Sequence, residues 1–207
     1  MKVLLLNGSC HKEGSTYTAL CEIEKVLNGE GIETEIVQIG VNPIRDCIGC
    51  GGCVKLGKCV FNDDAVNEFI EKAKGADGFV FGSPVYYAHP DGRIQCFLDR
   101  AFYAGKASFC HKPAAVIAVA RRAGTTASVD VLNKYPTIAE MPLVSSSYWN
   151  MAFGSNPDDI RKDGEGLQTM RNLGKNMAWI LKCIEAGKAA GIDVPDTERG
   201  AKTNFIR

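Results

Sequence analysis

Four cysteines within thirteen residues are the part of this sequence best suited to chemistry, because thiolate sulfur is a ligand for soft metals. They are Cys47, Cys50, Cys53 and Cys59, with the spacing C-x2-C-x2-C-x5-C. This spacing is close to the compact runs that hold one cube of four irons and four sulfides. The sequence has no second run of this kind, so we expect Cys59 to complete the same site. The glycines that allow the sharp turns of such a loop are Gly49, Gly51, Gly52 and Gly57.

A zinc site and a metal-free loop are the alternatives for these cysteines. Structural zinc sites usually supply two separated pairs of ligands, whereas here three thiols follow one another at successive steps of three residues. That difference favours the cube over zinc. From the spacing alone, reduced thiols in a glycine-rich loop stay open as well.

A second chemical segment is the hydroxyl-rich turn that follows the first apolar run. Ser9, Ser15 and Thr16 lie between that run and the start of a predicted helix. Hydroxyls and free backbone N–H groups at a helix start bind a phosphate dianion without a cationic side chain. The turn has neither Gly-Lys-Ser/Thr nor G-x-G-x-x-G, which excludes the common nucleotide fingerprints. The alternative is a plain Ser or Thr helix cap.

Two later loops have the composition of a site for a planar ring. Residues 83–90 place Tyr86 and Tyr87 beside Pro84, and residues 120–126 contain two adjacent arginines. A partly apolar ring fits against the first loop. Backbone N–H groups and a guanidinium of the second loop would stabilise an anionic reduced ring. The alternatives are tyrosines that pack a crossover connection and arginines in a solvated loop.

Strands and helices alternate along the chain, which predicts a parallel sheet covered on both faces. The expected strands are residues 2–6, 33–39, 78–81 and 114–119, with a weaker one near Leu143. The expected helices are residues 15–27, a helix capped by Asp63 or Asp64, 92–103, 126–134 and 167–184. In such doubly wound sheets ligands lie at the carboxyl ends of the strands, where the three loops would meet.

Composition excludes several classes of protein. Lysine plus arginine equals aspartate plus glutamate at 24 each, without a basic block, so we expect no nucleic-acid partner and no membrane surface. No apolar stretch approaches the ~20 residues of a membrane helix, and no targeting segment is visible. The cysteine count of nine is odd, and the cysteines are clustered rather than spread as pairs, which argues against a secreted disulfide framework and for a cytoplasmic protein. The cysteines expected to be small, buried or partly buried apolar residues are Cys10, Cys21, Cys96, Cys110 and Cys183.

Taken together, these motifs resemble the flavodoxin-like NADPH-dependent FMN reductases, and within them the iron-sulfur flavoproteins of anaerobic prokaryotes. The motifs that carry the resemblance are Asn7-Gly-Ser9 to Ser15-Thr16, the cysteine run, Gly82-Ser-Pro-Val-Tyr86-Tyr87, Phe97-Leu-Asp-Arg100, Arg121 to Gly124 and Thr203-Asn-Phe-Ile-Arg207. The resemblance implies an α/β, flavodoxin-like, doubly wound sheet of five parallel strands with a cysteine-rich loop after the second strand. We expect an FMN-binding domain at residues 1–187, with the cysteine loop at 43–62, and an irregular C-terminal arm at 188–207, where glycines and a proline interrupt the chain.

The same resemblance implies where the cofactors bind. The FMN phosphate would lie on Ser9, His11, Ser15 and Thr16. The flavin ring would lie against Pro84, Val85, Tyr86, Tyr87, Ala120, Arg121, Arg122, Ala123 and Gly124. A homodimer or homotetramer is implied, in which flavin and cluster approach each other across a subunit boundary. Trp149 is predicted to approach a flavin, and an ordinary core or interface tryptophan is the alternative.

The expected function is an oxidoreductase that passes electrons between NAD(P)H or ferredoxin and an acceptor through FMN and a 4Fe-4S cluster. The acceptor would be a further protein or a small molecule such as a quinone, oxygen or peroxide. No side chain is expected to be a nucleophile or general base, because the cofactors supply the chemistry. Two alternatives stay open: a cluster-free NAD(P)H-dependent FMN or quinone reductase, and a non-enzymatic redox or metal sensor.

Overall fold

A five-stranded parallel sheet forms the centre of the computed structural model, which describes residues 1–205. Its order is β2-β1-β3-β5-β6, as the flavodoxin-like prediction requires. The strands are β1 (Lys2–Asn7), β2 (Glu33–Gln38), β3 (Gly78–Tyr86), β5 (Ala114–Ala120) and β6 (Met151–Phe153). A two-residue strand, β4 (His89–Pro90), pairs antiparallel with the end of β3. In the register of the sheet, Leu5 of β1 lies between Ile36 and Val80.

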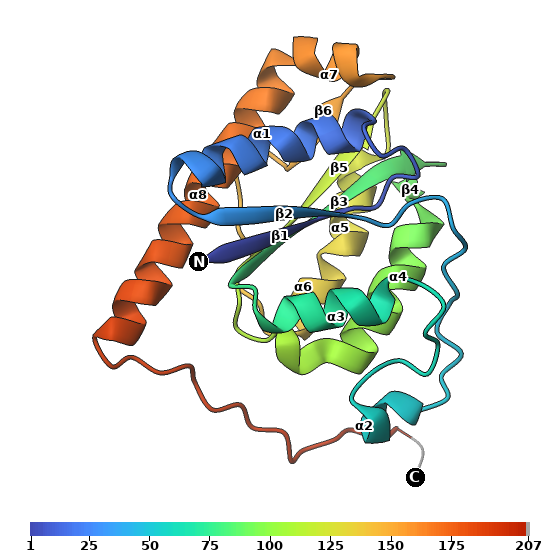
Figure 1. The fold of residues 1–207 in the computed structure, drawn as a ribbon, viewed down its shortest axis with the longest axis vertical. Helices are drawn as coiled ribbons and strands as arrows, with labels where there is room; N and C mark the ends of the chain where they lie inside the picture. Colours follow the sequence, from blue (N-terminus) through green and yellow to red (C-terminus); the bar gives the residue numbers. More distant parts are fainter. Residues whose placement is uncertain (206–207) are drawn as a thin grey trace.

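Helices cover both faces of this sheet (Figure 1). On one face lie α1 (Ser15–Gly29), α7 (Pro157–Lys162) and α8 (Gly164–Ala189). On the other lie α3 (Val66–Lys74), α4 (Gly92–Gly105), α5 (Thr125–Leu132) and α6 (Lys134–Ile138), with a 3-10 turn at Lys106–Ser108. The remaining short helix, α2 (Gly52–Leu56), lies in the long connection between β2 and α3, away from the sheet.

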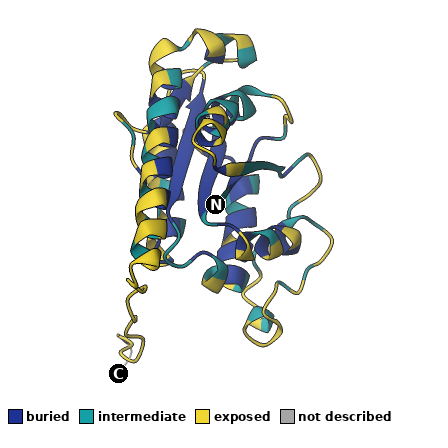
Figure 2. Cartoon of the chain, turned by 60° about the vertical axis from the view of Figure 1, so that its left-hand side comes forward, coloured by how far each residue is buried: buried dark blue, intermediate teal, exposed yellow. Residues whose placement is uncertain are grey.

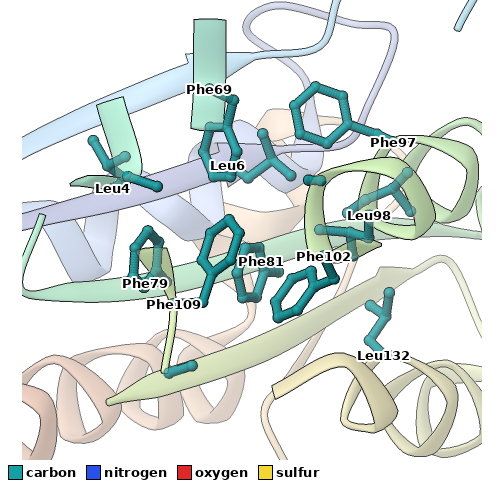
Figure 3. Packing of buried hydrophobic residues seen from close by; sticks show 14 of the residues in the cluster. Leu4, Leu6, Phe69, Phe79, Phe81, Phe97, Leu98, Phe102, Phe109 and Leu132 are labelled. Carbon is teal, nitrogen blue, oxygen red and sulfur yellow. The ribbon is translucent and has the colours of Figure 1, made fainter. Parts of the chain in front are cut away.

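Two apolar cores, one on each face, hold the helices to the sheet. Successive strand residues point to opposite faces, so Phe79 and Phe81 enter one core and Val80 enters the other. Phe79 lies edge to face with Phe109 at 5.1 Å between ring centroids, and Phe102 stacks on Phe109 at 4.5 Å. Figure 3 shows this group of rings between β3 and the helices. This packing fixes the position of α4 relative to the sheet, and α4 carries residues of the cysteine site described below.

The prediction of a strand near Leu143 was wrong. Leu143 makes a single bridge to Ala114, and the fifth strand is β6, which pairs with Ala118–Ala120. Between the two, residues 145–150 leave the sheet. Their polar groups bond to α8 instead: Asn176 Nδ2 donates to the Ser145 carbonyl at 2.8 Å, and Asn172 Nδ2 donates to Ser147 Oγ at 2.9 Å. The apolar pattern near Leu143 therefore corresponds to an isolated bridge to β5 that precedes the last strand.

The helices also differ in detail from the prediction. The helix expected over residues 126–134 is divided into α5 and α6 at Asn133, and the last helix extends beyond both ends of the expected range 167–184. Neither Asp63 nor Asp64 is the cap residue of α3, which is Ala65, although Asp64 Oδ1 accepts the Val66 N–H at 3.1 Å. The helices α2 and α7 were not predicted, because five or six residues give too little periodicity.

After α8, residues 191–205 contain no helix or strand and are exposed (Figure 2). Glu140 of the body bonds to Thr197 of this segment and, at 2.8 Å, to Arg199 Nη2. The helix before it ends at Ala189. Within residues 1–205, no helix has the length and apolar character needed to cross a membrane.

Candidate functional site: a cleft at the strand ends and a four-cysteine hollow

A cleft of about 300 Å³ lies where the carboxyl ends of β1, β3, β5 and β6 meet. Its walls are Ser9, His11, Ser15, Thr16, Pro84, Val85, Tyr86, Val119, Ala120, Arg121, Gly154 and Ser155. A second hollow of about 410 Å³, formed by residues 11–15 and 155–157, adjoins it through three shared residues. All three loops expected to form one site therefore contribute to one cleft. Sequence reasoning missed Gly154 and Ser155, because the last strand was placed too early.

The first loop owes its shape to polar side chains beneath it. Asn7, which is fully buried, donates from Nδ2 to Gln38 Oε1 at 2.5 Å and accepts the Ser9 N–H at 3.1 Å. Gln38 Nε2 in turn donates to the Ser9 carbonyl at 2.6 Å. Asn7 Nδ2 also reaches the carbonyls of His11 and Lys12 at 3.4 and 3.3 Å. The ends of β1 and β2 thus fix the backbone that faces the cleft.

The start of α1 has the features of an anion site. Its cap residue is Gly14, and no side chain caps the first turn, so the alternative of a plain Ser or Thr cap was wrong. The hydroxyls of Ser15 and Thr16, which line the cleft, have no hydrogen-bond partner among the described residues. Unsatisfied N–H groups and the positive end of the helix dipole therefore face the cleft together with two available hydroxyls.

The second loop is a hairpin whose two tip residues adopt left-handed backbone conformations. Tyr87 has φ 50° and Ala88 has φ 61°, as in the tight turns that connect antiparallel strands. Tyr86 lines the cleft and lies 3.8 Å from Cys10 between Oη and Sγ. The Cys10 hydrogen bond, and burial next, raise the pKa of Tyr86, which keeps its phenol protonated at neutral pH. Tyr87 is fully exposed and is not part of the cleft wall.

The third loop contacts the cleft through its first two residues and the hairpin through its last. Ala120 and Arg121 line the cleft, whereas Arg122 and Ala123 do not. Gly124 has φ 90°, and a Cβ built on it would lie 2.4 Å from Ala88 Cα. Only glycine permits this approach, so the third loop supports the hairpin from behind.

Replacing Gly124 with alanine is expected to destabilise the protein measurably. The left-handed conformation costs a non-glycine residue about 1–2 kcal/mol, and overpacking against Ala88 costs about 1–3 kcal/mol. Urea unfolding monitored by circular dichroism measures the change. Gly92→Ala is the matched control, because a Cβ there meets nothing within 4 Å and its φ is not left-handed. Equal unfolding midpoints for the two variants would contradict this account of Gly124.

Trp149 lies outside the cleft within one chain. It belongs to a separate hollow of about 400 Å³ that is lined by residues 143–150, by Val129 of α5 and by Asn133, which lies between α5 and α6. Its ring is edge to face with Tyr148, at 4.8 Å between centroids, and is 59% exposed. The structure therefore does not bring Trp149 to the other predicted flavin residues of the same chain.

The four predicted metal ligands line one hollow of about 100 Å³ in the connection between β2 and α3. Left-handed glycines at positions Gly49, Gly51 and Gly57 turn the chain around it. The other side chains of the wall are Ile48, Val60, Phe61, Arg100 and Tyr103. This mixture of thiols and apolar groups suits a soft metal centre shielded from water.

Two residues that sequence reasoning missed as site residues hold Cys59 in place. Arg100, buried on α4, donates from Nε to Cys59 Sγ at 3.1 Å. Asn67 of α3 binds both backbone groups of Cys59: its Oδ1 accepts the N–H at 2.9 Å, and its Nδ2 donates to the carbonyl at 3.0 Å. Arg100 is part of a sequence motif, but the sequence alone indicated no role for it. The feature that could have indicated one is the presence of an arginine on an otherwise apolar face of the helix.

Among the described residues, no three His, Cys, Asp or Glu side chains are grouped tightly enough to hold a single ion.

The remaining cysteines are part-buried, with one exception. Cys183 is exposed on α8, so the expectation that it is buried or partly buried was wrong. Burial raises the pKa of the Cys21 and Cys96 thiols, which keeps them protonated and unreactive at neutral pH.

Comparisons with known proteins agree with this arrangement. The model of the NADPH-dependent FMN reductase family matches residues 1–156. An iron-sulfur flavoprotein of Methanocaldococcus jannaschii is 33% identical over 194 residues, which are 89% of this chain and 100% of that protein. An iron-sulfur flavoprotein of Methanosarcina thermophila is 26% identical over 195 residues, which are 91% and 99% of the two chains.

Solved structures show the same fold at low identity. A flavone reductase has a TM-score of 0.68 at 19% identity, covering 89% of this chain and 64% of that one. A flavodoxin from the domain Archaea has a TM-score of 0.60 at 13% identity, covering 88% and 99%. The protein is therefore an FMN-dependent oxidoreductase that belongs to the NADPH-dependent FMN reductase family, in its iron-sulfur flavoprotein branch.

Proposed function

We propose that this protein transfers electrons between FMN in the cleft and one 4Fe-4S cluster held by Cys47, Cys50, Cys53 and Cys59. The observation that carries the proposal is that all four cysteines line a single hollow. The relatives named iron-sulfur flavoproteins support it, since the whole length of one of them aligns with 89% of this chain. The electron donor is NAD(P)H or ferredoxin, and the acceptor is a further protein or a small molecule such as a quinone, oxygen or peroxide.

The residues at the cleft fit FMN. The uncapped start of α1, with the hydroxyls of Ser15 and Thr16, receives the phosphate, and Ser9 and His11 complete that end. Pro84, Val85 and Tyr86 form the apolar wall for the ring, and Ala120 and Arg121 line the same cleft. Bound FMN supplies both two-electron and one-electron chemistry, which is what links a hydride donor to a one-electron centre. The chain's own part is to hold the ring, exclude water and provide hydrogen bonds.

The residues at the hollow fit the cluster. Four thiols line the hollow, and apolar side chains surround them. Bound there, the cluster supplies one-electron transfer. Cys59 accepts a hydrogen bond from Arg100, a common feature of cluster ligands.

A homodimer or homotetramer in the cytoplasm is part of the proposal. The cysteine loop exposes large apolar side chains next to the hollow: Val54 is 87% exposed, Ile48 61% and Leu56 56%. Clustered exposed apolar groups mark contact surfaces. A second subunit covering this loop would shield the cluster and bring its own cleft close.

Replacing Thr16 with valine is expected to raise the Kd for FMN about tenfold to a hundredfold. A hydrogen bond to a charged group contributes about 1.5–3 kcal/mol, and each 1.4 kcal/mol is a factor of ten. Quenching of flavin fluorescence on titration into the apoprotein measures the Kd. Thr18→Val is the matched control, because Thr18 Oγ1 donates to the Gly14 carbonyl on the same helix and does not line the cleft. An equal rise in the Kd for FMN in both variants would contradict a role for Thr16 in binding the phosphate.

An absorption spectrum of anaerobically purified protein, with iron and acid-labile sulfide counted against FMN, tests the proposal. We expect flavin bands on a broad absorbance near ~400 nm, with about four irons and four sulfides per chain. Flavin bands without iron, after anaerobic reconstitution with iron and sulfide, would overturn it in favour of a cluster-free reductase.

A further inference from the structure

Arg100 is the feature of the cysteine site that the proposed function leaves unexplained. It is 1% exposed although it is the longest cationic side chain available, and it extends from α4 to the hollow. Its Nε donates to Cys59 Sγ at 3.1 Å. Among the described residues, the sulfurs of Cys47, Cys50 and Cys53 accept no such bond. One ligand of the four is thus electrostatically distinct.

The direction of this guanidinium is fixed by several partners at once. Arg100 Nη1 and Nη2 both bond to the Asp64 carboxylate, and the side chains of this ion pair are 1% and 2% exposed. Nη1 also donates to the Arg45 carbonyl and Nη2 to the Phe61 carbonyl, each at 3.3 Å. The Nε–H is therefore the one donor of Arg100 left for a thiolate, and the bonds of the other two nitrogens fix its direction.

The acceptor is held as firmly as the donor. Asn67 binds the N–H and the carbonyl of Cys59 and also donates to the Phe61 carbonyl at 2.9 Å. The Phe61 ring lies 5.3 Å from the Arg100 guanidinium carbon, which closes that side of the hollow. The distance between Nε and Sγ is therefore set by two helices and by the loop between Cys59 and Asp64.

We propose that Arg100 raises the reduction potential of the cluster by donating to the Cys59 sulfur, with Asp64 limiting the size of that effect. The inference rests on the proposed function, since it requires the cluster. Reduction places one more negative charge on the iron-sulfur centre and its four thiolates. A cationic donor to one sulfur stabilises the reduced form more than the oxidised form, because charge-assisted bonds strengthen as the acceptor gains charge. Asp64 opposes this as a nearby negative charge, but it lies behind the guanidinium.

The signs of two substitutions follow from this arrangement. Arg100→Lys keeps a cation for Asp64 and removes the planar Nε–H directed at Cys59, so the potential should fall. Asp64→Asn keeps an oxygen acceptor and removes the opposing charge, so the potential should rise. A residue that only supports the loop has no reason to produce shifts of opposite sign.

The experiment is a reductive titration of FMN-loaded, iron-reconstituted protein, with the reduced cluster followed by electron paramagnetic resonance. For Arg100→Lys we expect the one-electron reduction constant to fall about tenfold, which is 59 mV. For Asp64→Asn we expect a rise of at least threefold. Arg45→Lys is the matched control: its guanidinium carbon also lies 5.2 Å from the Phe61 ring centroid, but it pairs with Asp63 at the surface and reaches no sulfur. Its constant should stay within twofold of the wild type.

The outcomes separate this inference from the proposed function. Wild type that binds no iron after reconstitution would contradict both. Wild type with about four irons, but with variant potentials that are unchanged or shifted in the same direction, would overturn the role of Arg100 alone. Opposite shifts at equal iron content would support it. If Arg100→Lys does not fold, Asp64→Asn still tests the inference: a higher reduction potential of the cluster supports it, and an unchanged or lower potential contradicts it.

Discussion

Replacing Cys50 with serine is expected to lower bound iron from about four atoms per chain to less than one, while FMN stays bound. Serine oxygen is a poor ligand for this soft centre, and three thiols leave one iron without its protein ligand. Cys50 is the exposed member of the four, so the substitution leaves the apolar cores intact. The cleft and the cysteine hollow have no wall residue in common, which is why flavin binding should survive.

Iron, sulfide and FMN analysis of the purified variant provides the measurement. Cys183→Ser is the matched control, since Cys183 is also an exposed thiol but lies on α8. It should retain the iron content of the wild type. Loss of FMN together with iron in Cys50→Ser would show that the two sites depend on each other within the molecule, contrary to their separation in the fold.

Replacing Asp64 with alanine is expected to destabilise the protein by about 3–5 kcal/mol, because it leaves Arg100 as a buried cation without its partner. For a chain of this length, that corresponds to a fall in Tm of roughly 6–20 °C. The neighbouring Asp63→Ala is the control. Asp63 pairs with Arg45 at the surface, where its side chain is 55% exposed, so its removal should leave Tm nearly unchanged.

Differential scanning calorimetry of both variants distinguishes the two carboxylates. A Tm for Asp64→Ala within 2 °C of Asp63→Ala would mean that water reaches the Arg100 guanidinium in solution. Because adjacent residues of the same type are compared, differences in the unfolded chain are small.

The sequence was sufficient to predict the sheet and the loops at its carboxyl ends, because continuous apolar runs and hydroxyl or aromatic loops are local patterns. The cysteine ligands were predictable for the same reason. Arg100 and Gln38 were not, since their roles depend on partners that are 41 and 29 residues away in the chain. Neither distance is visible in a local pattern of residue types.

The last strand was misplaced for a different reason. Leu143 and β6 both touch β5, and residues 145–150 between them find hydrogen bonds on α8. Local hydrophobicity identified the first contact, but only the tertiary partners decide which part continues as a strand. The same error hid Gly154 and Ser155 from the list of expected cleft residues.

The interruption of that last strand also affects how the folded protein behaves at high concentration. An uninterrupted edge strand offers a row of open N–H and C=O groups to other chains and promotes aggregation. Here β6 offers only three residues, and the polar stretch before it is already bonded to α8. At the opposite edge, β2 carries Glu33 and Glu35, which pair with Lys2 at 3.2 and 2.9 Å. Both edge strands of the sheet are thereby protected against pairing with other chains. The protein can therefore expose an apolar cysteine loop to a partner without also exposing an aggregation-prone sheet edge.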